Sequence, residues 1–330
     1  MTNFLLRRIR ILAAAVALTV CTMGTVPALA QPRKIVLIGT LGTAFGSAPH
    51  VVGLRDGLTA RGYKENEDFA IGVRFTSGDL SALDAAAQDL LRFEVDIIFA
   101  MGINAANAAR RATSTKPIIF VGVDEPVQAG LVSSFARPGG NITGVADNNA
   151  LLAPKRLEIL RQLVPGIRTV LFVYDASAQD PAKQARAYAK AARRLGIEFM
   201  GRAVSTEAEA RAAIATAVRD GVDGILSPGE PALNIPGVVL QFAKQKGLPT
   251  MFPAAFWPDF GALASYAPGF RESGRQAARL VEKIMRGENP ADIPVEVNNE
   301  IEFVVNLKVA KSLGLEISPE VLYQAHRIIR

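Results

Sequence analysis

The sequence predicts an α/β protein of two similar lobes, each built on a parallel sheet, and two observations lead to this prediction. Short apolar runs of strand length alternate with longer segments of helical periodicity, which is the pattern of parallel β-α-β units. The pattern then repeats, because the expected strands begin near residues 34, 69, 95 and 117 and again near 168, 197, 222 and 248. Self-similarity over this length indicates two lobes on one plan.

The first half is expected to hold apolar strands separated by helices. The clearest helix spans residues 79–93, because Leu83, Ala87 and Leu90 repeat at helical spacing on one face. The expected strands are residues 34–39, 69–75, 95–100, 117–123 and 141–146, and the expected helices are residues 51–61, 79–93 and 105–112.

The second half repeats this alternation. Its best-marked helix has Pro181 in the first turn, where a proline is tolerated, and Gly196 just past the end. The third strands of the two halves share their text, VDIIFAMG at residues 95–102 and VDGILSPG at residues 222–229. The expected strands are residues 168–174, 197–203, 222–226, 248–252 and 262–266, and the expected helices are residues 154–163, 181–195, 207–219, 238–246 and 271–286.

We therefore predict two Rossmann-like lobes joined by hinges. Ligands of open α/β sheets bind beyond the carboxyl ends of the strands, and a cleft between two lobes is a favoured place for a small molecule. Lobe 1 is expected to comprise residues 31–146 with about 269–297, lobe 2 residues 151–266 with about 300–330, and the hinges residues near 147–150, 267–269 and 297–300.

The first thirty residues stand apart from this pattern. Three arginines within residues 7–10 precede an apolar run, residues 11–23, and residues 28–30 read Ala-Leu-Ala. The run is too short to span a bilayer as a helix. We predict a secretory signal peptide over residues 1–30, cleaved after its last residue. The alternatives are an uncleaved membrane anchor and lipidation at Cys21.

Cleavage of this peptide removes the only cysteine and lowers the net charge of +6 by three arginines to +3. The absence of thiols excludes cysteine catalysis, cysteine-based zinc sites and iron–sulfur clusters. A mild charge without a basic block predicts no nucleic-acid partner. With only two histidines, His50 and His326, we predict no metal and no other cofactor.

Candidate ligand contacts in the first lobe follow its strands. The glycine-rich stretch at residues 39–46 has no nucleotide-binding fingerprint. It is expected to form a wide turn in which Thr40 and Leu41 meet a ligand. Gly102, Ile103 and Asn104 form a strand-to-helix junction, where free N–H groups favour a carboxylate. An ordinary capped turn is the alternative.

Two acids, Asp124 and Glu125, follow the next strand. They are expected to receive an ammonium group, and the alternative is that both are solvated surface acids. The facing lobe offers further candidates at its strand ends. An aromatic ring there either covers an apolar part of the ligand or only packs at the rim of the cleft. The candidates of the second lobe are Tyr174, Asp175, Ser227, Gly229, Glu230 and Phe256.

Catalytic arrangements are weakly supported. His50 lies beside the glycine-rich stretch and is one possible member of a Ser-His-Asp triad, but a histidine at a surface or helix start fits better. Asp175 and Glu230 are conceivable as a general acid and base, although nothing in the sequence fixes their separation. We predict no catalytic residues.

Five segments of the chain carry a resemblance to a known family. They are GLRDGLTARGY (53–63), RRATSTKPIIFV (110–121), PVQAGLVSSFARPGGNITGV (126–145), KRLEILRQLVPG (155–166) and EFVVNLKVAKSLGLEISP (302–319). On these segments the chain resembles the substrate-binding proteins of bacterial ABC transporters that share the type I periplasmic-binding fold, a family that includes tryptophan- and phenylalanine-binding members. The resemblance covers nearly all of residues 33–330. The chain departs from the family at Glu125, where aspartate is usual, and at residues 102–104, where Gly-Thr-Pro is usual.

The resemblance implies a periplasmic receptor that closes on a small solute, an amino acid or related carboxylate, and delivers it to an ABC permease in the inner membrane. It implies no catalysis, and we expect a monomer. The alternatives are a ligand-sensing receptor that serves a signalling partner and an exported enzyme on the same scaffold.

Overall fold

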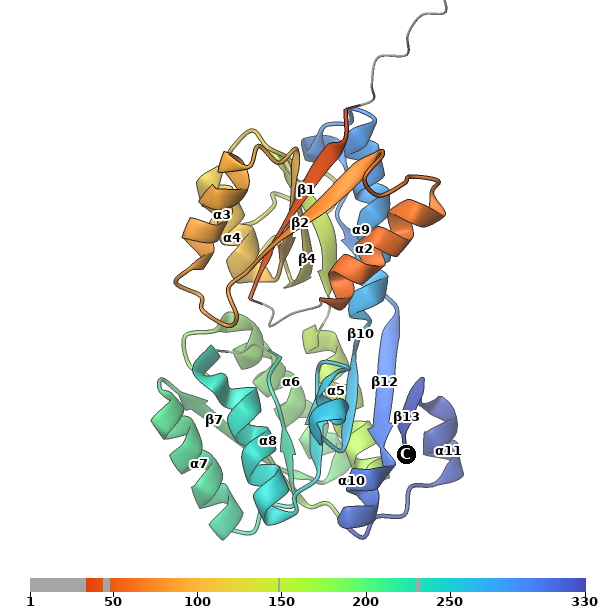
Figure 1. The fold of residues 1–330 in the computed structure, drawn as a ribbon. Coiled ribbons are helices and arrows are strands. Elements are labelled where there is room, and N and C mark those ends of the chain that lie inside the picture. The colour runs from red at the N-terminus through yellow and green to blue at the C-terminus, as the bar shows by residue number, and fades with distance from the viewer. Residues whose placement is uncertain (1–33, 44–47, 148, 230–231) are drawn as a thin grey trace, which may run out of the picture. The chain divides into compact units, whose positions relative to one another are not determined.

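Two mostly parallel sheets, each between layers of helices, make up the part of the chain that the computed structural model describes (Figure 1). The described residues are 34–43, 48–147, 149–229 and 232–330. From Ile35 to Arg330 they belong to one compact unit. The predicted signal peptide lies outside the described residues.

Sheet A has six strands in the order β11-β5-β4-β3-β1-β2, and every neighbouring pair is parallel. Helices α2 and α9 cover one of its faces, and α3 and α4 cover the other (Figure 1). The strands are β1 (Val36–Gly42), β2 (Phe69–Phe75), β3 (Ile97–Met101), β4 (Ile118–Asp124), β5 (Ile142–Asp147) and β11 (Glu296–Val297), and the helices are α2 (Pro49–Ala60), α3 (Leu83–Arg92), α4 (Ile103–Ala112), α9 (Phe270–Met285) and the 3₁₀ turn η3 (Pro290–Asp292).

Both faces of sheet A are apolar because its strands alternate between two cores. In β3, Ile97 and Phe99 point to α2 and α9, and Ile98 and Ala100 point to α3 and α4. The α2–α9 contact depends on glycine. A Cβ on Gly53 would lie 1.8 Å from the carbonyl oxygen of Arg271.

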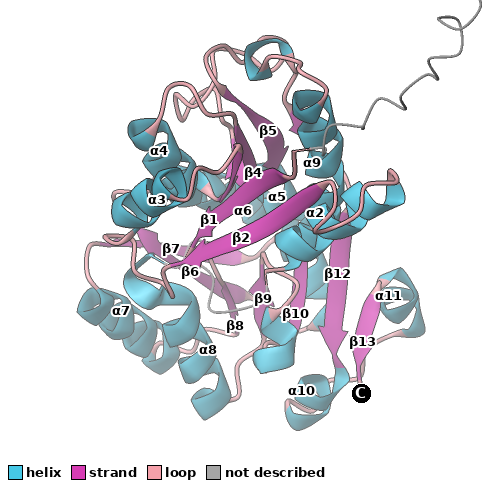
Figure 2. Cartoon of the chain, turned by 45° about the horizontal axis from the view of Figure 1, so that its top comes forward, coloured by secondary structure: helices cyan, strands magenta, loops and turns pink. Residues whose placement is uncertain are grey.

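Sheet B has seven strands in the order β13-β12-β10-β9-β8-β6-β7, and its pairs are parallel except β10 with β12 (Figure 2). The strands are β6 (Thr169–Asp175), β7 (Glu198–Val204), β8 (Gly224–Leu226), β9 (Thr250–Phe252), β10 (Ala264–Pro268), β12 (Ile301–Asn306) and β13 (Arg327–Ile329). The helices are α5 (Asn149–Leu163), α6 (Gln179–Leu195), α7 (Glu207–Arg219), α8 (Ile235–Lys246), α10 (Leu307–Ser312) and α11 (Pro319–Gln324), with 3₁₀ turns η1 (Ala232–Asn234) and η2 (Trp257–Phe260).

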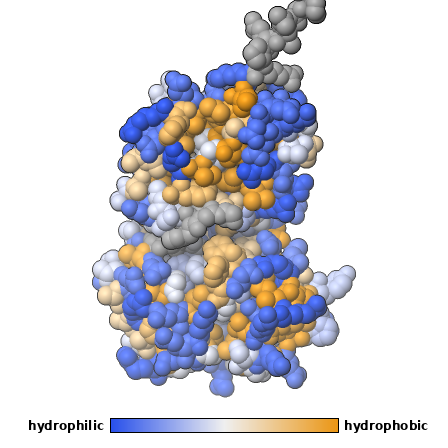
Figure 3. All heavy atoms as spheres, in the orientation of Figure 1, coloured by the Kyte–Doolittle hydropathy of each residue, from blue (hydrophilic) through white to orange (hydrophobic). Residues whose placement is uncertain are grey.

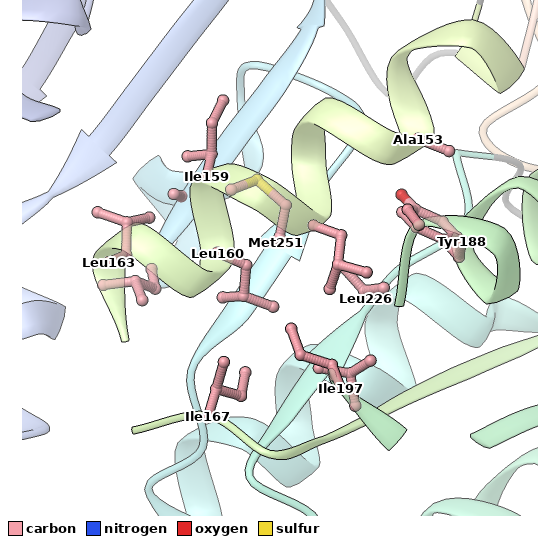
Figure 4. Close-up of a cluster of buried hydrophobic side chains, with 14 of the residues drawn as sticks. Ala153, Ile159, Leu160, Leu163, Ile167, Tyr188, Ile197, Leu226 and Met251 are labelled. Carbon is pink, nitrogen blue, oxygen red and sulfur yellow. The ribbon is translucent and has the colours of Figure 1, made fainter. Parts of the chain in front are cut away.

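The core between sheet B and helices α5 and α6 is shown in Figure 4. Leu160 of α5 lies beside Leu226 and Met251, which project from two neighbouring strands. Tyr188 of α6 is fully buried in the same core. Helices α7 and α8 pack on the opposite face.

Most elements match the sequence predictions, and three differences stand out. The predicted loop at residues 40–42 is wrong, because β1 continues to Gly42 and pairs with both β2 and β3. Five further elements, β11, β12, β13, α10 and α11, were not predicted from the sequence. The predicted parallel sheets are confirmed with one exception, the antiparallel pair of β10 and β12.

The chain passes between the two sheets at three places, after β5, after β10 and after β11. Two of these crossings are bonded to each other. The amide of Asn298 donates to the carbonyl oxygen of Gly269 at 3.0 Å, and the backbone N–H of Gly269 donates to that of Glu300 at 2.8 Å. These places coincide with the predicted hinges, and bending there remains a proposal.

Candidate ligand-binding site

Strand β4 is interrupted by a bulge at Gly122, whose φ of +67° lies in the left-handed region that favours glycine. Val121 packs toward α2 and α9, whereas Val123 packs toward α3 and α4, although a regular strand would place both on one face. The bulge therefore reverses the face of the sheet to which each side chain after Gly122 in β4 points.

Three polar groups from different elements converge above Gly122. The position that a Cβ on Gly122 would occupy lies 3.6 Å from His50 Nε2, 3.9 Å from the backbone nitrogen of Gly102 and 4.0 Å from Asp147 Oδ2. The N–H of Gly102 itself donates to the carbonyl oxygen of Val121 at 2.8 Å. Gly102 and Gly122 are themselves half-buried, so solvent reaches this space. We call Gly122 and its three polar neighbours, His50, Gly102 and Asp147, the Gly122 site.

His50 forms one wall of the Gly122 site from the start of α2. Its ring stacks on Phe270 of α9, with centroids 4.5 Å apart and planes inclined by 22°. Nε2 has no hydrogen-bond partner among the described residues. Burial lowers the pKa of His50 to about 4, so the imidazole is neutral at pH 7.

Asp147 forms the opposite wall, at the end of β5, in register with Asp124 at the end of β4. Only 2% of Asp147 is exposed, and its Oδ1 has no partner among the described residues. Burial, and then the neighbouring Asp124 charge, raise the pKa of Asp147 to about 8. Burial also raises the pKa of Asp124, opposed by hydrogen bonds from Asn149, whose backbone N–H donates at 3.0 Å.

The positive charge that lowers the pKa of both members of this acid pair is the fully buried Arg156 of α5. Its guanidinium donates to the carbonyl oxygen of Tyr266 at 2.6 Å, and to the carbonyl and side-chain oxygens of Asn149 at 3.0 and 2.6 Å. Arg156 thus lies close enough to influence both carboxyl groups while its hydrogen bonds go elsewhere.

A row of aromatic rings leads from the Gly122 site to sheet B. After His50 and Phe270 come Phe256, 6.4 Å from Phe270, and Trp257, 5.1 Å from Phe256. Phe256 is 41% exposed. Figure 3 shows that the surface narrows between the two lobes, with apolar residues exposed above and below the narrowing.

The structure brings some of the predicted first-lobe residues together. Gly102 is the N-cap of α4, with φ of +84° and no side-chain cap. Asn104 is exposed in the first helical turn, whereas Ile103 packs partly against the core. The predicted position of Leu41 in a loop is wrong, because its side chain is fully buried beneath α3 and α4. Thr40 is also within β1, and its hydroxyl is buried without a partner among the described residues.

Glu125, expected either to receive the ammonium group of a ligand or to be solvated, forms an ion pair and is partly exposed in this structure. Its carboxylate accepts a hydrogen bond from Lys183 of α6, which also donates to Gln128 at 2.6 Å. The pair joins the end of β4 to a helix of sheet B. Its side chains are 21% (Lys183) and 37% (Glu125) exposed.

The predicted residues of the second lobe are more scattered. Tyr174 is the next-to-last residue of β6, at the strand end where it was predicted, and its ring stacks on Phe172 at 5.6 Å. Asp175 accepts hydrogen bonds from the N–H and hydroxyl of Ser177 at 2.8 and 2.7 Å. Ser227 is buried and donates to the carbonyl oxygen of Pro228.

Gly229 is exposed, and Glu230 lies outside the described residues, as does the acid–base pair that it would have formed with Asp175. No group of three or more His, Cys, Asp or Glu side chains that could hold a metal ion occurs within residues 34–43, 48–147, 149–229 and 232–330. Within the same ranges, no helix combines the length and apolar character needed to cross a bilayer.

Several residues of the site were not predicted from the sequence, Gly122 among them. Asp147 was assigned to a hinge although it ends β5 just as Asp124 ends β4, so the strand-end rule would have found it. Arg156 and Phe270 sit in regular helical patterns, and nothing in their local sequence sets them apart.

Comparison with known proteins gives consistent matches. A family model described as "ABC transporter substrate binding protein" matches residues 46–329. The chain is 28% identical over 261 residues to a tyrosine-binding protein of Clostridioides difficile strain R20291, a match that covers 78% of this chain and 74% of that protein.

Two solved structures are similar over most of the chain. The ABC domain in complex with L-Trp from Streptococcus pneumonia is 27% identical, with a TM-score of 0.78, covering 90% of this chain and 100% of that one. A ligand-free, open substrate-binding protein with adhesive properties from Clostridium difficile is 25% identical, with a TM-score of 0.68, covering 90% and 99%. These likenesses confirm the predicted fold of two α/β lobes.

Proposed function

Because this chain belongs to the family of ABC transporter substrate-binding proteins, we propose that it is the periplasmic receptor of an ABC importer. In this proposal it binds an α-amino acid between its two sheets and delivers it, as a monomer, to a permease in the inner membrane. The ligands named for its relatives, L-Trp and tyrosine, support an amino acid.

The row of aromatic rings is the observation that points to the ligand's side chain. Phe270 and Phe256 lie between the Gly122 site on sheet A and Trp257, which packs on Phe252 of β9 in sheet B. Aromatic rings attract one another at centroid distances of about 4.5–7 Å. A ligand with an aromatic side chain would extend this row over the exposed ring of Phe256, and we therefore propose an aromatic amino acid.

The start of α4 is the proposed site for the ligand's carboxylate. Gly102 has no side chain to cap the helix, so the first N–H groups of α4 have no partner within the helix or from its cap. Such groups, together with the helix dipole, favour an anion. The family's usual threonine is absent here, which leaves the backbone as the donor of these hydrogen bonds.

Thermal-shift screening followed by calorimetry tests this function. We expect L-Trp, L-Tyr or L-Phe to raise the melting temperature, whereas L-Glu and adenine leave it unchanged. A ligand at 100 times its Kd adds about 2.7 kcal/mol of stability.

Phe256→Ala should weaken binding of L-Trp by about tenfold, the loss expected for one aromatic pair. Phe93→Ala is the control, because Phe93 is exposed to 61% and stands outside the row. Stabilisation by adenine alone, or unchanged affinity in the Phe256 variant, would contradict the proposal.

A further inference from the structure

Two carboxyl groups occupy neighbouring register positions at one end of sheet A. Asp124 and Asp147 are cross-strand partners at the carboxyl ends of β4 and β5. Like charges directly opposite each other in a sheet repel. When such a pair is also buried, one member holds its proton. The question is which carboxyl group is protonated, and what displaces that proton.

The hydrogen bonds of the pair are unequal. Asp124 accepts from both the backbone and the side-chain N–H groups of Asn149, at 3.0 and 3.3 Å, which favours its ionised form. Asp147 Oδ1 has no partner among the described residues, and Asp147 is more deeply buried than Asp124. Asp147 is therefore the member that holds the proton.

The groups that face Asp147 come from every neighbouring element. Asp124 on β4 opposes its ionisation, and Arg156 on α5 and the Asn298 side chain favour it. The remaining neighbour, His50 on α2, is neutral at pH 7. A neutral imidazole with an unpartnered Nε2 does not repel a cation that enters the space above Gly122.

We propose that the Gly122 site receives the ammonium group of the ligand, and that Asp147 gives up one proton to solvent when this group binds. This inference rests on the proposed function, because it requires an α-amino acid. The ammonium group keeps its three protons, Asp147 changes from carboxylic acid to carboxylate, and the released proton goes to the buffer. The backbone nitrogen of Gly102 lies beside the same space, so the ligand's carboxylate falls next to the start of α4.

Proton release makes affinity depend on pH in a defined direction. Below the pH at which free Asp147 ionises, the ligand competes with a bound proton, so the Kd for L-Trp should fall about tenfold for each unit of rising pH. Above about pH 8 the affinity should level off. The ligand indole-3-propionate lacks the ammonium group, so it should bind more weakly and release no proton.

Calorimetry of the full mature protein in phosphate and in Tris measures the released protons directly, because the two buffers differ in ionisation enthalpy. At pH 6.5 we expect about one proton per bound L-Trp. Asp147→Asn should abolish both the proton release and the pH dependence, and it should weaken binding at pH 8 by at least about tenfold. Asp124→Asn should retain a pH dependence.

A second variant fills the space itself and does not depend on the folding of the Asp147 variant. Gly122→Ala puts a methyl group between His50 and Asp147 and should weaken L-Trp binding at least about tenfold, since it occupies the ammonium position. Gly62→Ala is the matched control. Gly62 has φ of +88° and open space around it, so it bears the same backbone strain without filling a site.

The outcomes separate the two proposals. Tight binding of L-Trp with no proton release, or with release that persists in Asp147→Asn, would overturn this inference and leave the proposed function intact. If no amino acid binds at any pH, both are wrong. Unchanged affinity in Gly122→Ala would likewise overturn the placement of the ammonium group.

Discussion

Asp147 and His50 face each other across the Gly122 site and shift their pKa values in opposite directions. The folded protein holds the Asp147 proton up to about pH 8, whereas the unfolded chain loses it near pH 4. Stability therefore falls as the pH rises between these values. His50 titrates near pH 6.5 in the unfolded chain but near pH 4 when folded, so its contribution to stability rises with pH across that window.

The two effects offset each other between about pH 4 and 6.5, and Asp147 alone remains from 6.5 to 8. We predict that the unfolding free energy of the wild-type protein falls by roughly 2 kcal/mol between pH 6.5 and 8, and that this fall is absent in Asp147→Asn. Urea unfolding of both proteins at pH 6.5 and 8 measures the difference. Parallel pH profiles for the two proteins would contradict the assignment.

Arg156 is a third ionisable residue whose burial has an energetic consequence. Arg156→Met removes the buried cation beside two acids and three hydrogen bonds, and we expect a loss of about 3–5 kcal/mol. Arg161→Met on the same helix is the control, because Arg161 is exposed, and it should cost less than about 1 kcal/mol. Denaturant midpoints give both values. If both variants lost the same unfolding free energy, the buried position of Arg156 would make no extra contribution to stability, contrary to this prediction.

At this scale the sequence allowed only part of the site to be predicted. Gly102 and Asp124 were found because both follow an apolar strand. Gly122 was not, since its bulge interrupts a run that reads as one continuous strand, and the bulge is set by pairing with β5. Glu125 looked free because its partner, Lys183, is far away in the sequence.

At the scale of elements, the contact between α2 and α9 is set by backbone rather than by side chains. A Cβ on Gly274 would lie 2.0 Å from the carbonyl oxygen of His50, the mirror of the Gly53 contact. We predict that Gly53→Ala lowers the unfolding free energy by roughly 1–3 kcal/mol, because the helices must move apart.

Gly72→Ala on the edge strand β2 is the control for this substitution, since nothing lies within 4 Å of its added Cβ. Thermal unfolding should show a change within about 0.5 kcal/mol for it. Equal melting temperatures for Gly53→Ala and Gly72→Ala would contradict the prediction.

Elements with a strong local pattern were predicted well. Strand β2 and helix α7 have the bounds expected from their periodicity alone. The short strands β11 and β13 were missed, because two or three residues become a strand only through a partner that lies elsewhere in the chain.

At the scale of the whole molecule, the ion pair between Glu125 and Lys183 joins the layers of the two sheets. It stabilises the arrangement in which both sheets can contact one ligand. We predict that Lys183→Met weakens L-Trp binding about two- to fivefold, the worth of a partly exposed pair. Glu125→Gln should have a similar effect, and the double variant should lose little more.

Lys155→Met is the matched control, because Lys155 pairs with Glu158 inside one helix. Titration calorimetry compares all four variants. An equal effect of the Lys155 variant would show that the loss is not specific to the bridge between the sheets.

Because the chain passes between the two sheets three times, it also determines the order in which each sheet and its helices can be completed during folding. Sheet A needs α9 and β11, yet these follow nearly all of sheet B along the chain. During synthesis, apolar residues such as Val51 and Leu54 therefore stay uncovered until α9, which ends at Met285, has emerged. Neither lobe can be expressed as one continuous segment. The growing chain should also expose apolar surface, of the kind that chaperones bind, until α9 and β11 have been synthesised.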